Sequence, residues 1–281
     1  MATSPNSSMA GRLIVEMRAA FRKDVRVYLR NPSLILSEFI TLPAWFVLFG
    51  VGVAANFIPK GTVTSTLGTT SAFQFLYWGF VFLIVFSTSI WGIGQYIRTE
   101  QLQGTLEQLF LAPISRVNII FGRFARVFFS DLAIIAYTAL LIGGLGHQQL
   151  SIGNPLLFSL VFAILYFGVL GFGLIFAAVA FRIKSFNILS NLTQFLVIGL
   201  CGVFFPLTAL PAVVRPVSLA IPFTYFADLL RFAAAGSSTI LDPALEVLVA
   251  FGLSVALFIL GLVLFRVMEK SAQSRGIIGT H

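Results

Sequence analysis

Six long apolar stretches, separated by shorter polar segments, dominate the pattern along this chain of 281 residues. A bilayer core about 30 Å thick needs roughly 20 apolar residues in helical form, and each stretch comes close to that length or exceeds it. The pattern therefore predicts an all-α membrane protein with six transmembrane helices. The expected spans are 34–57, 71–97, 127–146, 155–181, 188–205 and 244–265.

The positive charges indicate how these spans are oriented. Residues 1–33 hold six of the eighteen Lys and Arg residues, 98–126 hold four, 182–187 hold two and the tail 266–281 holds three. Short segments rich in Lys and Arg are retained on the cytoplasmic side of a membrane. We therefore expect a cytoplasmic N-terminal segment (1–33), a transmembrane domain (34–265) and a cytoplasmic tail (266–281).

The N-terminal segment contains an amphipathic pattern between residues 9 and 30. Its basic residues fall mostly on the arc opposite the apolar one, which is typical of a helix lying in the membrane interface. Asn31 and Pro32 end this helix, because proline restricts the backbone of the residue before it. Anchoring to anionic lipid is the favoured interpretation, and docking of a cytoplasmic partner is the alternative. The apolar face comprises Leu13, Met17, Phe21, Val25 and Tyr28.

The cytoplasmic segment 98–126 contains a second short amphipathic element. Thr105 can cap a first turn that holds Glu107, and Pro113 closes the stretch. A short capped helix of this kind fits a groove in another protein, whereas an interfacial loop is the plainer alternative. Its apolar ridge consists of Leu106, Leu109 and Phe110.

Residues 206–243 are too apolar for a free loop, and five prolines cut them into pieces too short for a full crossing. We expect short re-entrant helices that dip into the outer leaflet and return before the last span. Asp228 and Arg231 lie three residues apart in this segment, so they would share a helix face and could pair.

Polar side chains within the spans form a candidate translocation path. They are costly in lipid, so they must meet protein or water. The fifth span carries a narrow polar stripe, which either hydrogen-bonds across a dimer seam or lines a path. The path candidates are Glu38 on the first span, Thr88, Trp91 and Gln95 on the second, and Asn187, Asn191 and Gln194 on or beside the fifth.

Two carboxylates have structural alternatives. Glu38 either neutralises Arg30 or another interfacial arginine, or faces a polar entrance for a cationic substrate. For Asp131, an ion pair with Arg126 at the cytoplasmic end of the third span is the favoured interpretation.

Composition narrows the function classes. The chain is 58% hydrophobic and 10% charged with a mean hydropathy of +0.98, whereas a soluble domain is about 45–50% apolar and 25% charged. One cysteine and two histidines leave little for thiol or metal chemistry. No pattern typical of an intramembrane enzyme is present, and the net charge of +8 reflects topology rather than nucleic-acid binding.

Two motifs indicate a family. One comprises Glu100, Gly104-Thr105-Leu106-Glu107, Leu109, Pro113 and Arg116, and the other is Pro222-Phe223-Thr224-Tyr225 with Asp228 and Arg231. With these motifs the chain resembles the membrane subunit of ABC-2 type transporters over essentially its whole length. The first motif, with Phe110, is similar to the family's cytoplasmic coupling helix. Leu102 stands where many members have a second acidic residue.

The resemblance implies a permease of a bacterial or archaeal cytoplasmic membrane. It would pair with a second copy or a paralogue and dock on separate ABC ATPase subunits, which would bind the ATP and magnesium. The chain has no Gly-Lys pair for a phosphate-binding loop, so we expect no cofactor on it.

The expected activity is export of an amphipathic or lipophilic compound, such as a drug or antibiotic. Export of a lipid-linked glycan or lipid, or a scaffold without transport, are the alternatives.

Overall fold

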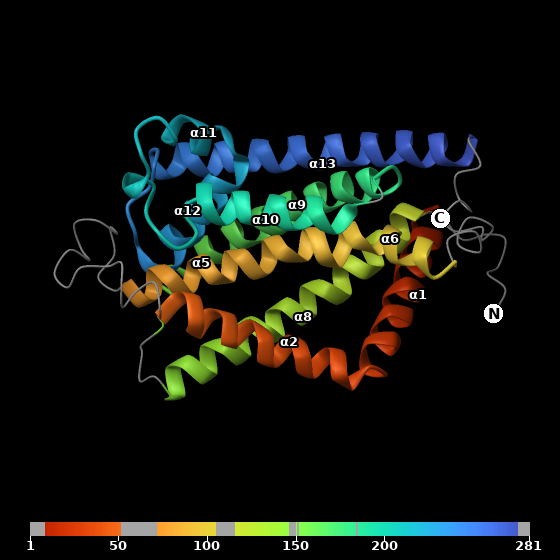
Figure 1. Cartoon of the computed structure of the whole chain (residues 1–281), viewed down its shortest axis with the longest axis horizontal. Helices are drawn as coiled ribbons and strands as arrows, with labels where there is room; N and C mark the ends of the chain where they lie inside the picture. Colours follow the sequence, from red (N-terminus) through yellow and green to blue (C-terminus); the bar gives the residue numbers. More distant parts are fainter. Residues whose placement is uncertain are drawn as a thin grey trace.

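The computed structural model describes residues 9–51, 72–104, 116–145, 150, 152–183 and 185–274, and these parts contain helices and no strands. Most helices run along one long axis, whereas α1 stands across one end of the bundle (Figure 1). In chain order the elements are α1 (Met9–Leu29), α2 (Pro32–Trp45), the π-helix η1 (Phe46–Val51), α5 (Ala72–Ser87), the π-helix η2 (Thr88–Gly94), α6 (Gln95–Leu102), α8 (Arg116–Leu145), α9 (Pro155–Ala180), α10 (Phe186–Leu200), the 3-10 helix η3 (Leu207–Ala209), α11 (Arg215–Ala220), α12 (Pro222–Ala235) and α13 (Pro243–Ser274).

Four helical stretches of the described chain are long and apolar enough to cross a membrane: Phe73–Leu102, Val117–Leu141, Pro155–Ala180 and Pro243–Ser271. A fifth would be Ile14–Leu29 with Pro32–Leu48, which are bent by 81°. The predicted fifth span corresponds to α10, a shorter apolar helix. The structure therefore supports a multi-pass helical protein with four or five candidate spans, and the count of six stays a prediction.

The α1 helix packs against α8 through a close backbone approach. A Cβ atom added at Gly122 would lie 2.6 Å from the Cβ of Ala20 and 2.9 Å from the carbonyl oxygen of Met17. Phe21 meets Phe129 edge to face, with ring centroids 6.0 Å apart. The face of α1 predicted to be apolar thus contacts protein along part of its length, and its location in the membrane interface stays a prediction.

The third span begins earlier than its apolar pattern indicated. Helix α8 starts at Arg116, whereas the prediction placed the start of the span at residue 127. The polar residues in this extra length have partners on α1: the amide of Asn118 donates to Glu16 over 2.7 Å, and Arg123 lies 3.5 Å from Asp24. Since α1 satisfies these groups, the helix continues beyond the apolar stretch.

Helices α9 and α13 form the most closely packed pair. A Cβ atom added at Gly261 would lie 2.3 Å from the carbonyl oxygen of Gly171, and one at Gly171 would lie 2.4 Å from the backbone nitrogen of Phe258. The hydroxyl of Ser254 donates to the carbonyl oxygen of Ile164 over 3.0 Å. Small residues at a membrane-helix interface permit this approach of the two backbones.

Helices α5, η2 and α6 follow one another without a break and pack against the other side of α9. A Cβ atom added at Gly94 would lie 2.7 Å from the Cβ of Phe176, and one at Gly173 would lie 2.9 Å from that of Ile93. The rings of Phe86 and Phe223 lie 4.6 Å apart and join α12 to this core.

Short helices η3, α11 and α12 separate α10 from α13, as the prolines indicated, and lie at the end of the bundle opposite α1 (Figure 1). Their depth in a membrane stays a prediction.

The suggested pairing of Asp228 with Arg231 is wrong, because no ion pair joins them among the described residues. Arg231 instead donates to the carbonyl oxygens of Gly202 (2.6 Å) and Val203 (2.5 Å), and Asp228 accepts from the backbone of Ile240 (2.9 Å).

We expect Gly261→Leu to destabilise the protein, because its side chain would overlap the α9 backbone; overpacking of this kind costs about 1–3 kcal/mol. Thermal unfolding in detergent measures the effect. Gly252→Leu, on the same helix with no atom within 4 Å of its added Cβ, is the matched control. Equal melting temperatures for the two variants would contradict this packing.

Candidate functional site

A cavity of about 430 Å³ lies between α2, α5 and α10. We call it the α2–α5–α10 cavity. Its apolar wall comes from all three helices and includes Trp45, Phe80 and Ile198, whereas its polar groups are Thr41, Ser87, Asn191 and Gln194. No charged residue is present among the described residues that line it. The cavity therefore offers a large apolar surface with a few amide and hydroxyl groups, which is typical of small-molecule sites.

Side-chain hydrogen bonds connect α10 to the second span beside this cavity. The indole nitrogen of Trp91 donates to Gln194 Oε1 over 2.8 Å, and Gln194 Nε2 donates to the hydroxyl of Ser87 over 3.0 Å. Further along, Gln95 Nε2 donates to Asn187 Oδ1 over 3.3 Å. The structure thus brings together the path candidates of the second and fifth predicted spans, with Asn191 in the cavity wall.

A second cavity, of about 530 Å³, lies between α1, α2, the second span and α8. We call it the α1–α2–α8 cavity. Its lining includes the path candidates Glu38, Thr88 and Trp91. The two cavities adjoin, because the same residues line both of them: Thr41, Leu42, Ile84 and Ser87.

Glu38 and Asp131 both line the second cavity and both accept hydrogen bonds from hydroxyl groups. Glu38 Oε2 accepts from Tyr28 over 2.5 Å. Asp131 Oδ2 accepts from Thr88 over 2.7 Å and from Tyr166 over 2.9 Å. The prediction that Asp131 forms an ion pair with Arg126 is wrong, because no such pair is present among the described residues. The Asp131 side chain reaches other helices, and the guanidinium of Arg126 lies 4.8 Å from the centre of the Tyr28 ring.

Arg123, on α8, contacts three other helical segments: η2, α1 and α6. Its Nε donates to the carbonyl oxygen of Gly92 in η2 over 2.5 Å, and its Nη1 lies 3.5 Å from Asp24 on α1. Its guanidinium lies 4.6 Å from the ring centre of Tyr96 on α6. A π-helix leaves backbone carbonyls outside the usual α-helical pattern, and such segments are frequent at functional sites. Arg123 therefore connects α1 to the backbone of η2 through a single side chain on α8.

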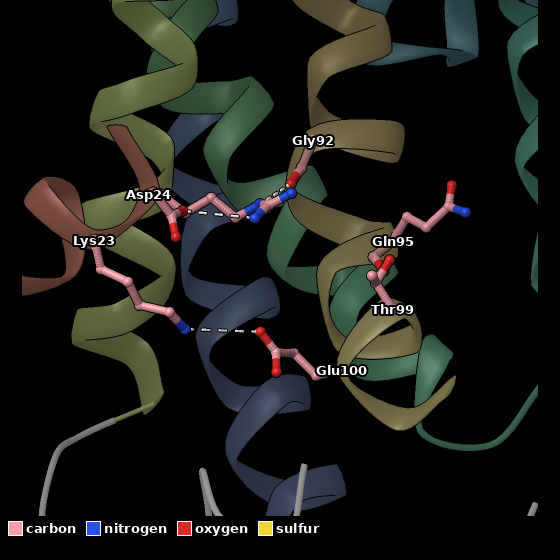
Figure 2. Close-up of polar contacts among 7 residues, drawn as sticks. Lys23, Asp24, Gly92, Gln95, Thr99 and Glu100 are labelled. Carbon is pink, nitrogen blue, oxygen red and sulfur yellow. Dashed lines mark hydrogen bonds and ion pairs between the residues drawn. The ribbon is translucent and has the colours of Figure 1, made fainter. Parts of the chain in front are cut away.

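A second contact joins α1 to α6. Lys23 Nζ lies 4.0 Å from Glu100 Oε1, near the end of α6, and Figure 2 shows the two side chains pointing toward each other. The hydroxyl of Thr99 donates back to the carbonyl oxygen of Gln95 over 3.0 Å. Gly104 follows with a φ of +67°, a conformation that favours glycine. The chain thus turns sharply just before the predicted coupling helix.

Most of the predicted coupling helix lies outside the described residues, namely Thr105, Leu106, Glu107, Leu109, Phe110 and Pro113, as does the side chain of Leu13. Of the remaining predicted residues, Arg116 begins α8. On α1, the side chains of Met17, Phe21, Val25 and Tyr28 are partly buried, while the basic side chains between them are exposed.

Sequence reasoning missed Arg123, Asp24, Ser87 and Tyr166 as members of these networks. In the sequence Arg123 is only one of the basic residues of segment 98–126, and its position four residues before the predicted third span is the one available signal of a buried partner. Asp24 is an acidic residue among the basic residues of the N-terminal segment, and this opposite charge is the available signal of a basic partner on another helix. Nothing in the local pattern distinguished Ser87 or Tyr166.

A family model of the ABC-2 type transporter matches residues 15–234, which is most of the chain. The chain belongs to the ABC-2 type transporter family. The match runs from α1 to the end of α12 and includes both cavities and the Arg123 contacts. A comparison with curated proteins finds no significant match. ABC-2 membrane domains are permease components that work with ABC ATPase subunits.

We expect Arg123→Lys to destabilise the permease, because lysine cannot bond Gly92 and Asp24 while stacking on Tyr96; losing a hydrogen bond to a charged group costs about 1.5–3 kcal/mol. The melting temperature in detergent checks this. Arg182→Lys, at an exposed position whose side chain lies 3.5 Å from Ser271, is the control and should be nearly neutral. An Arg123→Lys variant as stable as the parent would argue against Arg123 as a link between helices.

Proposed function

We propose that this permease exports an amphipathic or lipophilic compound, such as a drug or antibiotic, across the cytoplasmic membrane of a bacterium or archaeon. The observation that carries this proposal is the α2–α5–α10 cavity. Its volume of about 430 Å³ suits a drug-sized molecule, for which pockets measure about 300–1,000 Å³. The apolar lining would bind the body of the substrate, and Ser87, Asn191 and Gln194 would bind a polar group on it.

Energy would come from ATPase subunits on separate chains, which bind the ATP and magnesium. In this proposal both ends of the permease are cytoplasmic. The ATPase docks on the predicted coupling helix between Glu100 and Arg116 and on α1. The Lys23–Glu100 and Arg123 contacts would then carry its movement into η2, whose neighbours Ser87 and Gln95 hold α10.

A second permease, as an identical copy or a paralogue, would complete the path. Large apolar side chains on α10 are exposed in the single chain, including Ile188 (70%) and Phe195 (67%). Lipid or a second α10 would cover them. The proposed path therefore lies beside a surface that a partner permease could contact.

The apolar lining favours a lipophilic substrate over a lipid-linked glycan. A sugar presents many hydroxyl groups, which need polar partners when they are removed from water. The described lining of the α2–α5–α10 cavity is mostly aliphatic and aromatic. A scaffold without transport would have no need of a cavity of this size between its helices.

Filling the cavity should reduce transport without unfolding the permease. In the complex purified through a tag on the permease and reconstituted into liposomes, Ile198→Trp should lower efflux of an amphipathic dye, rhodamine 6G, by about tenfold, since the larger ring occupies the binding volume. Leu192→Trp is the matched control, because Leu192 lies on the same helix but is not among the described residues that line the cavity. Unchanged efflux with Ile198→Trp would contradict this location of the path.

Reversing a charge in the predicted coupling helix should uncouple the two subunits. Glu107→Arg should leave the permease folded and inserted, while ATP hydrolysis by the co-purified ATPase loses its response to rhodamine 6G. Lys270→Glu, an exposed charge on α13, is the control and should keep the response. If Glu107→Arg retains full stimulation, the coupling contact lies elsewhere.

A further inference from the structure

A third cavity, of about 280 Å³, lies at the end of the bundle opposite α1, between the end of α10, α11, α12 and residues 237–240. We call it the α11–α12 cavity. Its rim is exposed and polar, with Thr208, Arg215 and Ser238. Two polar side chains in its wall, Arg231 (3% exposed) and Ser237 (4%), are almost fully buried. The cavity thus leads from an exposed guanidinium to a buried one.

The guanidinium of Arg231 is held firmly but is not saturated. Its Nε donates to the carbonyl oxygen of Phe75 over 3.3 Å, and its Nη2 donates to those of Gly202 and Val203. Its Cζ also lies 3.8 Å from the centre of the Phe75 ring. A guanidinium has five N–H groups, so the two on Nη1 are left without a partner among the described residues. Arg231 therefore has donors to offer in a fixed position.

Ser237 adds a second unsatisfied group. Its hydroxyl is buried and has no hydrogen-bond partner among the described residues. Buried polar atoms in native proteins are nearly always hydrogen-bonded, so a buried hydroxyl in the wall of a polar cavity points to a bound molecule. The groups available to that molecule are hydrogen-bond donors on both the floor and the rim.

Arg215 is positioned on the rim by its own backbone contacts. Its Nε donates to the carbonyl oxygen of Leu210 over 3.0 Å and its Nη2 to that of Thr208 over 2.6 Å. The guanidinium is therefore ordered although it is exposed. Its Nη1 has no partner among the described residues, as is the case for Arg231.

Asp228 is the one acidic side chain among the described residues that line this cavity, and it is already engaged. Its Oδ2 accepts from the backbone nitrogen of Ile240 over 2.9 Å. Burial raises the pKa of Asp228, although Arg231 opposes this shift. The two guanidinium groups therefore outweigh the single carboxyl group, and the cavity favours an anion.

We propose that the α11–α12 cavity binds a phosphate group, with Arg215 on the rim, Arg231 on the floor and the hydroxyl of Ser237 as a further donor. Guanidinium groups match the oxygen geometry of phosphate, and both of them would give charge-assisted hydrogen bonds to it. The phosphate belongs either to a lipid headgroup or to a free anion in solution. This site is separate from the α2–α5–α10 cavity and does not depend on what the permease exports.

Binding is tested on the purified full-length permease in detergent. Native mass spectrometry measures retention of phosphatidylglycerol against diacylglycerol with the same acyl chains. Melting curves compare inorganic phosphate with chloride at equal ionic strength. Arg215→Gln should weaken phosphatidylglycerol or phosphate binding by about tenfold, because charge-assisted bonds are lost. Arg266→Gln, an exposed arginine on α13 in the half of that helix away from this cavity, makes the same charge change and should bind as the parent does.

The Ser237→Ala variant distinguishes binding inside the cavity from nonspecific attraction to positive surface charge. It should weaken binding by about threefold, as expected for the loss of one hydroxyl donor. Preferential retention of phosphatidylglycerol would support a lipid headgroup, and a higher melting temperature in phosphate alone would support a free anion. The proposal is overturned if neither probe binds, if Ser237→Ala binds like the parent, or if Arg266→Gln weakens binding as much as Arg215→Gln.

Discussion

Polar side chains inside an apolar helical bundle must find partners, because neither lipid nor packed hydrocarbon can hydrogen-bond them. In this permease the second span carries the side chains that do so for two neighbouring helices, α8 and α10. Thr88 and Tyr166 both donate to Asp131, which joins the second span and α9 to α8. Trp91 and Ser87 bond Gln194, which joins the second span to α10. The relative positions of these helices, and of the cavities between them, depend on those few bonds.

Packing divides the permease into a tightly packed part and a less enclosed part. The backbones of α9 and α13 touch through Gly171 and Gly261, and the second span fits against α9 on the other side. The α10 helix is different, because most of its side chains are at least partly exposed and no atom lies within 4 Å of a Cβ added at Gly199. Helices with fewer buried contacts separate from the rest of a protein at a lower free-energy cost. Movement of α10 and α2 relative to α9 and α13 would change the α2–α5–α10 cavity while leaving the core intact.

The sequence predicted what depends on local periodicity. The polar stripe of Asn187, Asn191 and Gln194 was visible because a helix places residues three and four apart on one face. The prolines of 206–243 predicted short helices, and η3, α11 and α12 are short. Partners distant in sequence could not be predicted, since no spacing rule links Arg123 to Gly92 or Asp131 to Tyr166. The same reason explains Asp228 and Arg231, whose shared face suggested a pair although each had a better partner elsewhere in the fold.

In the proposed transport cycle, α10 faces a path whose exposure to water changes. Single cysteines at positions 191, 192 and 194, in a Cys201→Ala background, can be labelled with a water-soluble maleimide in the membrane-embedded complex with its ATPase. Labelling is compared between the nucleotide-free state and a state trapped with ATP. Labelling at 191 and 194 should change between the two states, whereas labelling at 192, which is not among the described residues that line the cavity, should not. Equal labelling at 191 and 194 in both states would show that the polar stripe is static packing and that α10 does not face such a path.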